Sequence, residues 1–314
     1  MNYTKLGNFE AVCLLTILFI NHLVLNLPQM ILDSSGTASA LNVVYIIALA
    51  LIFVLLIIKL FKKFLGLDII DISEYLGGKF LKILVGILCI IYLIMESAFL
   101  TRMFSKNLLL VYFENYPIAF IIFLILFIAV VANIFGRKSI IKSNTIIVPI
   151  AILSIFLTSI FVIDLLKVER SLPLFGNGAS QIFLSGASNI FAFNGLFFLF
   201  FISPMLEKKE NLSKVAFYSV IVSGVLLLLS IITLVYAFSD IYTIIQISPI
   251  YYIIVNSRLG AFLERPEIIF IFTWILALMS FLSIAVMYIL DIFRKITMKK
   301  RPEKVVLILL YGIL

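Results

Sequence analysis

The stretch IFLSGASNIFAFNGLFFLFFISPML, Ile182–Leu206, decides the fold of this chain. A helix needs about 20 apolar residues to cross the roughly 30 Å hydrocarbon core of a bilayer, and this run is long enough. Its middle, however, carries Asn189, Asn194 and Gly195 in place of aliphatic residues. They predict a helix that loosens at mid-membrane, where free backbone groups are tolerated only if they are buried in protein or line a wet cavity.

The composition of the whole chain places this stretch in a polytopic membrane protein. The 314 residues are 64% hydrophobic and 13% charged, with a mean hydropathy of +1.24, whereas a soluble domain carries about 25% charged residues. We expect an all-α single transmembrane domain over residues 1–314, with eight full spans and part of a ninth. Cys13 and Cys89 lie inside apolar runs and are expected to be buried thiols without a disulfide.

Apolar runs separated by polar loops predict the spans. Span one is also interrupted, because His22, Asn26 and Pro28 fall inside it. Val305–Leu314 would begin a ninth span, but ten residues reach only about 15 Å, so we expect the chain to stop inside a membrane segment. The eight full spans are Phe9–Leu32, Leu41–Phe61, Ile83–Phe104, Ile118–Phe135, Thr145–Leu166, Ile182–Leu206, Val215–Phe238 and Ile268–Phe293, with short helices at Ile69–Tyr75 and Tyr251–Leu263.

The order of the spans suggests a repeat. Most of the 24 lysine and arginine residues fall in alternate loops, which places the N-terminus in the cytoplasm. Interrupted span one is followed by four more spans, and interrupted span six by spans seven, eight and the start of a ninth. A repeat of five spans leaves the two halves in opposite orientations. We therefore expect an inverted-repeat transporter-like bundle with broken helices one and six. Residues 1–166 would form the first five-helix repeat and residues 167–314 a truncated second, with a binding site between the broken helices.

Polar residues within the two broken spans are candidates for ligand contact. Asn194 and Gly195 would offer backbone N–H groups and a half-helix N-terminus to a carboxylate. Alternatively, the glycine lets two helices pack closely while the asparagine bonds across their interface. His22 and Asn26 occupy the partner break, and for the histidine a satisfied interior role is the alternative.

Glu96 stands in the middle of span three. A carboxylate at that depth is costly unless it faces the bundle interior and is partnered or protonated. We expect a proton-sensitive or amine-binding group beside the pocket, with Tyr92 one turn earlier on the same face. A structural hydrogen bond to a neighbouring helix is the alternative. Phe191 and Phe193 are expected to line the pocket wall.

Span eight offers a different kind of candidate at its outer mouth. Arg265 and Glu267 would form a gate or a subunit contact, and the alternative is an exposed pair worth about 0–1 kcal/mol. Ser280 and Ser283 are a weak indication of a cation site near the first break. The chain has one histidine, no metal-ligand cluster, no GxSxG and no phosphate-binding loop, so we expect no enzyme, no metal and no cofactor.

Motifs along the chain share the spacing of one known family. They are LERPEIIFIFTWILA at Leu263–Ala277, with Arg265, Glu267 and the one Trp, Trp274; SLPLFGNG at Ser171–Gly178; Gly195 followed by Pro204; and Leu27–Pro28. From Phe9 to about Lys304 the chain resembles the B-subunits of spore germinant receptors, the endospore germination permeases of the amino-acid/polyamine transporter superfamily. Phe197 stands where that family usually has an acidic residue, so the ligand cannot be carried over.

The resemblance implies a membrane subunit of a nutrient germinant receptor. It would bind a small molecule, expected to be an amino acid, at the midplane and signal spore germination through partner subunits. The implied partners are a membrane-attached A-type subunit and a lipoprotein C-type subunit, in the inner membrane of the bacterial cell or spore. The alternatives are an active, ion-coupled amino-acid permease of the same fold and a non-binding structural subunit. The net charge of +8 sits in loops, so we expect membrane lipid and no nucleic acid as a partner.

Overall fold

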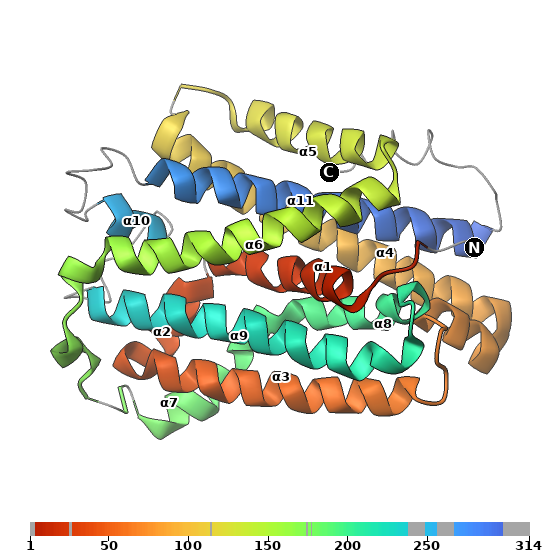
Figure 1. Ribbon diagram of the computed structural model, residues 1–314, viewed down its shortest axis with the longest axis horizontal. Coiled ribbons are helices and arrows are strands. Elements are labelled where there is room, and N and C mark those ends of the chain that lie inside the picture. The colour runs from red at the N-terminus through yellow and green to blue at the C-terminus, as the bar shows by residue number, and fades with distance from the viewer. Residues whose placement is uncertain are drawn as a thin grey trace.

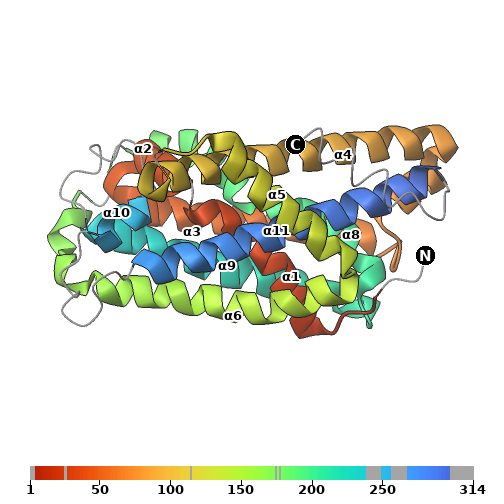
Figure 2. The same cartoon turned by 90° about the horizontal axis from the view of Figure 1, so that it is seen from above.

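The fold is a bundle of long helices. The computed structural model describes residues 4–24, 27–113, 115–173, 175–176, 178–237, 249–255 and 267–297. The long helices run side by side along the long axis of the molecule (Figure 1), and the view from above shows them in more than one layer (Figure 2). The α-helices are α1 (Asn8–Ile20), α2 (Leu27–Ser35), α3 (Ser39–Phe61), α4 (Ile69–Tyr112), α5 (Ile118–Ile134), α6 (Arg137–Phe161), α7 (Ala179–Phe183), α8 (Leu199–Ile202), α9 (Leu212–Ala237), α10 (Pro249–Val255) and α11 (Glu267–Thr297).

Length and composition fit these helices to a bilayer. Six helical segments in the described part of the chain could cross a membrane, and two shorter apolar helices, Asn8–Leu23 and Ile118–Ile134, accompany them. Large hydrophobic side chains such as Phe127 and Phe156 are exposed on the outer faces, as expected where lipid covers them. The prediction of an all-α polytopic membrane protein is confirmed. The six segments are Leu27–Phe61, Ile69–Leu110, Arg137–Phe161, Ala179–Met205, Lys209–Ala237 and Glu267–Thr297.

The first span is interrupted, as the sequence predicts. α1 ends at Ile20, a short 3₁₀ segment η1 (Asn21–Val24) follows, and α2 resumes at Leu27. Asn21 Nδ2 donates to the Ile17 carbonyl at 2.5 Å, so a side chain satisfies a backbone acceptor at the end of α1. Nine of the 13 residues of α1 are buried, and the helix contacts α6, α9 and the sixth span. The break therefore lies in the interior of the bundle.

The sixth span is irregular along most of its length. Between α7 and α8 it forms a 3₁₀ segment of 14 residues, η5 (Ser185–Phe198), in which Phe193 leaves helical geometry at φ −107° and ψ 30°. Runs of 3₁₀ helix longer than about four residues are uncommon because their hydrogen bonds are poorly aligned. A last 3₁₀ turn, η6 (Ser203–Met205), closes the span. Loosening is thus spread over η5 and not confined to Asn194 and Gly195.

Backbone hydrogen bonds fix the two interrupted spans against each other. Leu6, just before α1, donates its N–H to the Met205 carbonyl at 2.8 Å, and Glu207 donates to the Leu6 carbonyl at 3.0 Å. The start of the first span therefore meets the end of the sixth, so the two run antiparallel. Along the same interface α1 contacts η5.

The expected interfacial helix and third span form one long element. α4 covers 44 residues, and a kink at Gly77–Gly78 separates its first two turns from the rest. Gly78 has φ 66° and ψ −161°, a combination that only glycine adopts without strain. The two helices expected from the sequence are therefore joined by a kink and not by a loop.

Other boundaries also differ from expectation. The fifth span was expected to begin at Thr145, where its apolar run starts. The helix α6 begins earlier, at Arg137, because its first turns are polar and lie before that apolar run. α10 begins at Pro249, and the remainder of the helix expected at Tyr251–Leu263 lies outside the described residues. The expected ninth span, Val305–Leu314, lies outside them as well.

Ion pairs join the end of α11 to two other helices. Lys295 Nζ donates to Asp68 Oδ2 at 2.6 Å and to Asp71 Oδ2 at 2.5 Å, and Arg137 at the start of α6 pairs with Asp291. Asp68 also caps α4 by accepting from the Asp71 backbone N–H at 3.0 Å. Burial raises the pKa of the Asp68 carboxyl, while the ammonium of Lys295 opposes that rise. Removing one partner of such a buried group is expected to be costly.

Candidate functional site

A cluster of three polar side chains lies between the interrupted spans and α4. His22 comes from η1, Glu96 from α4 and Asn194 from η5. Glu96 Oε1 is 2.7 Å from His22 Nε2 and 2.5 Å from Asn194 Nδ2, and the two nitrogens are 2.7 Å apart. The side chains of His22 and Glu96 are each 14% exposed. Three residues that the sequence nominates separately therefore share one site, which we call the His–Glu–Asn cluster.

One carboxylate oxygen is the centre of the cluster. Glu96 Oε1 accepts from Asn194 Nδ2 and also lies within hydrogen-bond distance of His22 Nε2. Asn194 Oδ1 is buried and has no hydrogen-bond partner within the described part of the chain. The cluster thus offers a negative charge and an unpaired acceptor, both of which suit a ligand that donates hydrogen bonds.

An aromatic wall flanks the cluster. Tyr92 lies one turn before Glu96 on α4, and its ring centroid is 4.4 Å from that of Phe197 on η5. Phe197 also contacts Phe201, with ring centroids 5.2 Å apart. An acidic residue at position 197, as the resembled family usually has, would add a second carboxylate beside Glu96. Phe197 instead presents an apolar ring there.

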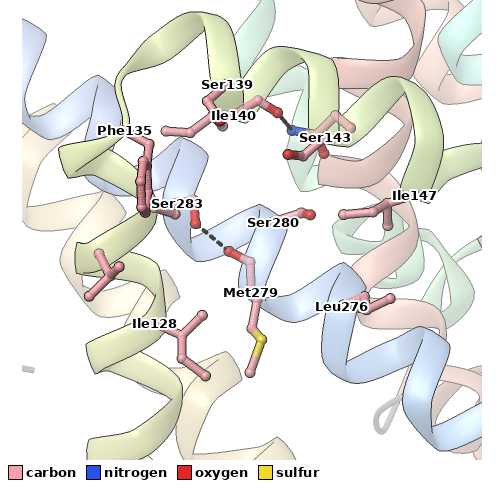
Figure 3. A pocket seen from close by; sticks show the side chains of 13 residues that line it. Ile128, Phe135, Ser139, Ile140, Ser143, Ile147, Leu276, Met279, Ser280 and Ser283 are labelled. Atoms are coloured by element: carbon pink, nitrogen blue, oxygen red, sulfur yellow. Dashed lines mark hydrogen bonds between the residues drawn. The ribbon is translucent and has the colours of Figure 1, made fainter.

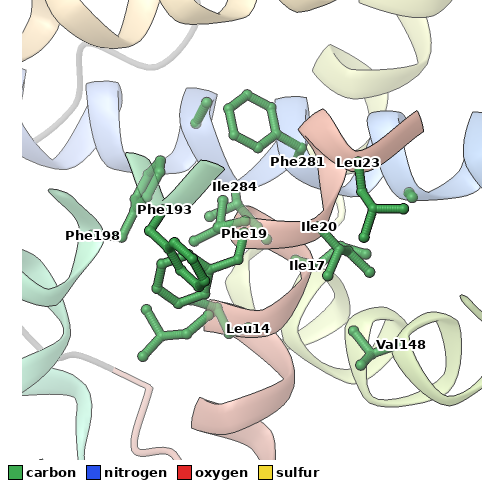
Figure 4. Packing of buried hydrophobic residues seen from close by; sticks show 14 of the residues in the cluster. Leu14, Ile17, Phe19, Ile20, Leu23, Val148, Phe193, Phe198, Phe281 and Ile284 are labelled. Atoms are coloured by element: carbon green, nitrogen blue, oxygen red, sulfur yellow. The ribbon is translucent and has the colours of Figure 1, made fainter. Parts of the chain in front are cut away.

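The remaining candidates of η5 separate into different environments. Phe193 is 2% exposed and packs edge-to-face on Phe19 of α1, with ring centroids 5.8 Å apart (Figure 4). A Cβ on Gly195 would lie 2.7 Å from the Phe19 ring and 3.2 Å from the Leu18 backbone, so this glycine permits the close approach of η5 to α1. Phe191 is 70% exposed on the outer surface and is not brought to the cluster.

Two of the other nominated residues, Asn26 and Arg265, lie outside the described residues. Glu267 opens α11 and is 7% exposed, at the end of the helix where the macrodipole favours a carboxylate. A gate or subunit contact at this position stays a prediction.

A second polar network, which the sequence did not predict, supports the N-terminal half of η5. Asn189 Nδ2 donates to Ser34 Oγ at 2.9 Å and to Asn42 Oδ1 at 2.8 Å. Asn42 Nδ2 in turn donates to the carbonyls of Ile182 at 2.8 Å and Gly186 at 3.1 Å. The signal in the sequence is one asparagine at the start of an otherwise apolar span two. Asn42 thereby satisfies carbonyls that the irregular helix leaves free.

Gly186→Ala is expected to disrupt this network. The added Cβ would lie 2.1 Å from Asn42 Nδ2, which two hydrogen bonds hold in place. Overpacking of this kind costs about 1–3 kcal/mol, so thermal unfolding of the purified variant should begin at a lower temperature. Gly7→Ala, where nothing lies within 4 Å, serves as the control and should cost less than about 1 kcal/mol. Equal unfolding temperatures for both variants would contradict the role given to Asn42.

Comparison with known proteins gives this arrangement its context. Residues 5–314 match the family model described as "Spore germination protein". This chain belongs to the spore germination protein family. It is also 23% identical over 274 residues to "Spore germination protein B2" of Bacillus subtilis (strain 168), an alignment that covers 86% of this chain and 74% of the relative. The resemblance inferred from the motifs is confirmed.

Membership of the spore germination family settles the class of the protein. The family consists of membrane transport and receptor proteins and not of enzymes, so the expectation of no enzymatic activity is confirmed. The helices described above agree with an integral membrane protein.

Proposed function

We propose that this chain is the membrane subunit of a nutrient germinant receptor and binds an amino acid between its two interrupted spans. Family membership supports the role in germination. The observation that carries the binding site is the meeting of His22, Glu96 and Asn194 at 2.5–2.7 Å across three elements. A subunit that only anchors a complex in the membrane would not need a polar cluster in its interior, because ionisable groups are costly in a membrane.

The cluster suits the ammonium group of an amino acid. Glu96 supplies the negative charge and Asn194 Oδ1 the unpaired acceptor. The irregular backbone of η5 supplies N–H groups for the carboxylate, as helix ends do in other solute sites. Tyr92 and Phe197 place aromatic surface beside the charges, and we assign it to the side chain of the ligand.

Signalling requires that the ligand favour one state of the bundle over another. An ammonium group at Glu96 competes with the contacts from His22 and Asn194, so binding changes how η1 and η5 meet α4. We propose that A-type and lipoprotein C-type subunits receive this change. The N-terminus would lie in the cytoplasm, and residues 1–166 and 167–314 would form inverted repeats.

An ion-coupled amino-acid permease is the second candidate. The titratable pair His22–Glu96 in the interior favours it, because such pairs take part in proton relays. Uptake of labelled amino acids into proteoliposomes under a proton gradient distinguishes the two. Vigorous gradient-dependent uptake would overturn the receptor proposal.

The binding proposal is tested by thermal unfolding of the purified chain with each of the common amino acids. A ligand at a hundred times its Kd stabilises the folded state by about 2.7 kcal/mol, so a bound amino acid should raise the unfolding temperature measurably. The N-acetylated and amidated derivatives of the same amino acid serve as controls, because each removes one of the two charges. If no member of the panel shifts the unfolding temperature, the chain is a non-binding subunit.

A further inference from the structure

A cavity of about 310 Å³ lies between α5, α6 and α11 (Figure 3). None of the three residues of the His–Glu–Asn cluster lines it. Ser139 and Ser143 face it from α6, and Ser280 and Ser283 face it from α11. A buried water occupies about 30 Å³, so the cavity has room for a small molecule and falls within the size range of ligand sites.

Asn144 of α6 supplies the decisive polar atom. Its side chain lines the cavity and is 1% exposed. Its Nδ2 donates to the Ile140 carbonyl at 2.8 Å, whereas its Oδ1 is buried without a hydrogen-bond partner in the part of the chain that the structure describes. A buried acceptor left unpaired is destabilising. A donor on a bound molecule would remove that penalty.

The other walls decide the charge of the ligand. The cavity is lined by serines, by Asn144 and by apolar side chains such as Ile147, Leu276 and Met279, with no acidic or basic residue among them. A charged molecule would lose water here without gaining a counter-charge. The walls therefore favour a neutral molecule with an apolar body and one hydrogen-bond donor.

The exposed part of the lining runs along α5 and the start of α6. Ile128, Phe135, Ser139 and Ser143 are exposed, whereas Asn144, Ser280 and Ser283 are buried. The exposed residues form the mouth and the buried ones the floor. A molecule entering here would place its apolar part along α5 and α11 and its donor near Asn144.

We propose that this cavity is a second binding site, for a small neutral amphiphile that donates a hydrogen bond to Asn144 Oδ1, as an alkanol or a primary amide does. The site is separate from the amino-acid site proposed above and does not depend on it. The ligand would bridge α6 and α11.

Photolabelling of the full chain in lipid nanodiscs tests the site. The probe is a diazirine-bearing octanol, and the matched probe is its methyl ether, which has the same body but no donor. Peptides covering residues 128–147 and 276–283 should be labelled saturably by the alcohol, competed by unlabelled octanol, and labelled much less by the ether. In Asn144→Leu, which removes the acceptor at nearly constant size, we expect affinity for the alcohol to fall about tenfold, as for loss of one hydrogen bond to a buried acceptor.

Two further variants keep the result decisive. Thr158→Val, also a buried polar residue of α6 but outside this cavity, should label like the unmodified chain. Ser280→Leu fills the floor and should abolish labelling even if Asn144→Leu does not fold. Equal labelling by alcohol and ether would overturn the hydrogen bond to Asn144 Oδ1. Labelling that does not saturate, or that is unchanged in Ser280→Leu, would overturn binding in the cavity itself.

Discussion

Glu96→Gln is expected to weaken amino-acid binding by about 30-fold or more while leaving the fold intact. Loss of one member of a buried charged pair at a binding site costs about 2–5 kcal/mol. The glutamine retains an oxygen that accepts from Asn194 Nδ2 and lies beside His22 Nε2, so the contacts within the cluster persist. What disappears is the negative charge that holds the ammonium group. The measurement is the concentration of the most stabilising amino acid needed for half of its maximal shift in unfolding temperature.

A matched control separates charge from general damage. Glu207→Gln removes a carboxylate from an exposed position next to η6 and should leave that concentration unchanged. Unaltered affinity in Glu96→Gln would mean that the cluster only holds three helices together. A lower unfolding temperature without ligand, together with unaltered affinity, would point the same way. In either case the amino acid would have to bind elsewhere.

Lys295→Met is expected to destabilise the chain by about 3–5 kcal/mol near neutral pH. The substitution leaves Asp68, 6% exposed in its side chain, and Asp71 without the ammonium that both accept from. Removing one partner of a buried ion pair leaves an uncompensated charge, which accounts for this magnitude. The methionine preserves most of the side-chain volume, so a packing defect contributes little.

The loss in Lys295→Met should depend on pH in a defined direction. Burial already raises the pKa of Asp68, and Lys295, which lowers it, is absent in the variant. A carboxyl with a folded pKa above its unfolded value, near 3.9, favours folding only when protonated. The deficit relative to the unmodified chain should therefore shrink as pH falls through the folded pKa and be full above it. Thermal unfolding at about pH 5 and about pH 8 measures this. Lys208→Met, on an exposed residue, should show neither effect, and a pH-independent deficit would contradict the assignment.

Most of the fold could be predicted from the apolar runs of the sequence and from the polar residues that interrupt them. The length of the apolar runs is set by the bilayer, and a polar residue in such a run must find a partner inside the protein. For that reason Asn194, His22 and Glu96 could be nominated from the sequence. The same reasoning missed Asn42, because one asparagine near the start of a span also fits an exposed helix end.

Periodicity alone did not decide which side chains of the sixth span are buried. Phe191 and Phe193 are two residues apart in the same irregular span, yet one is 70% exposed and the other 2%. Residues two positions apart lie about 200° apart around an α-helix and about 240° apart around a 3₁₀ helix, so these two face different sides in either geometry. Which of the two sides is buried depends on how η5 packs against α1, where Phe193 meets Phe19.

The sequence by itself determined that this is an all-α membrane protein, that its first and sixth spans are interrupted and that it resembles the spore germination proteins. These properties depend on composition and local order, which the chain carries along its length. Only the tertiary structure decided that His22, Glu96 and Asn194, 74 to 172 positions apart, meet at one point. Their meeting depends on α11, which contacts both α4 and η1, and such packing is a property of facing surfaces that no single span encodes.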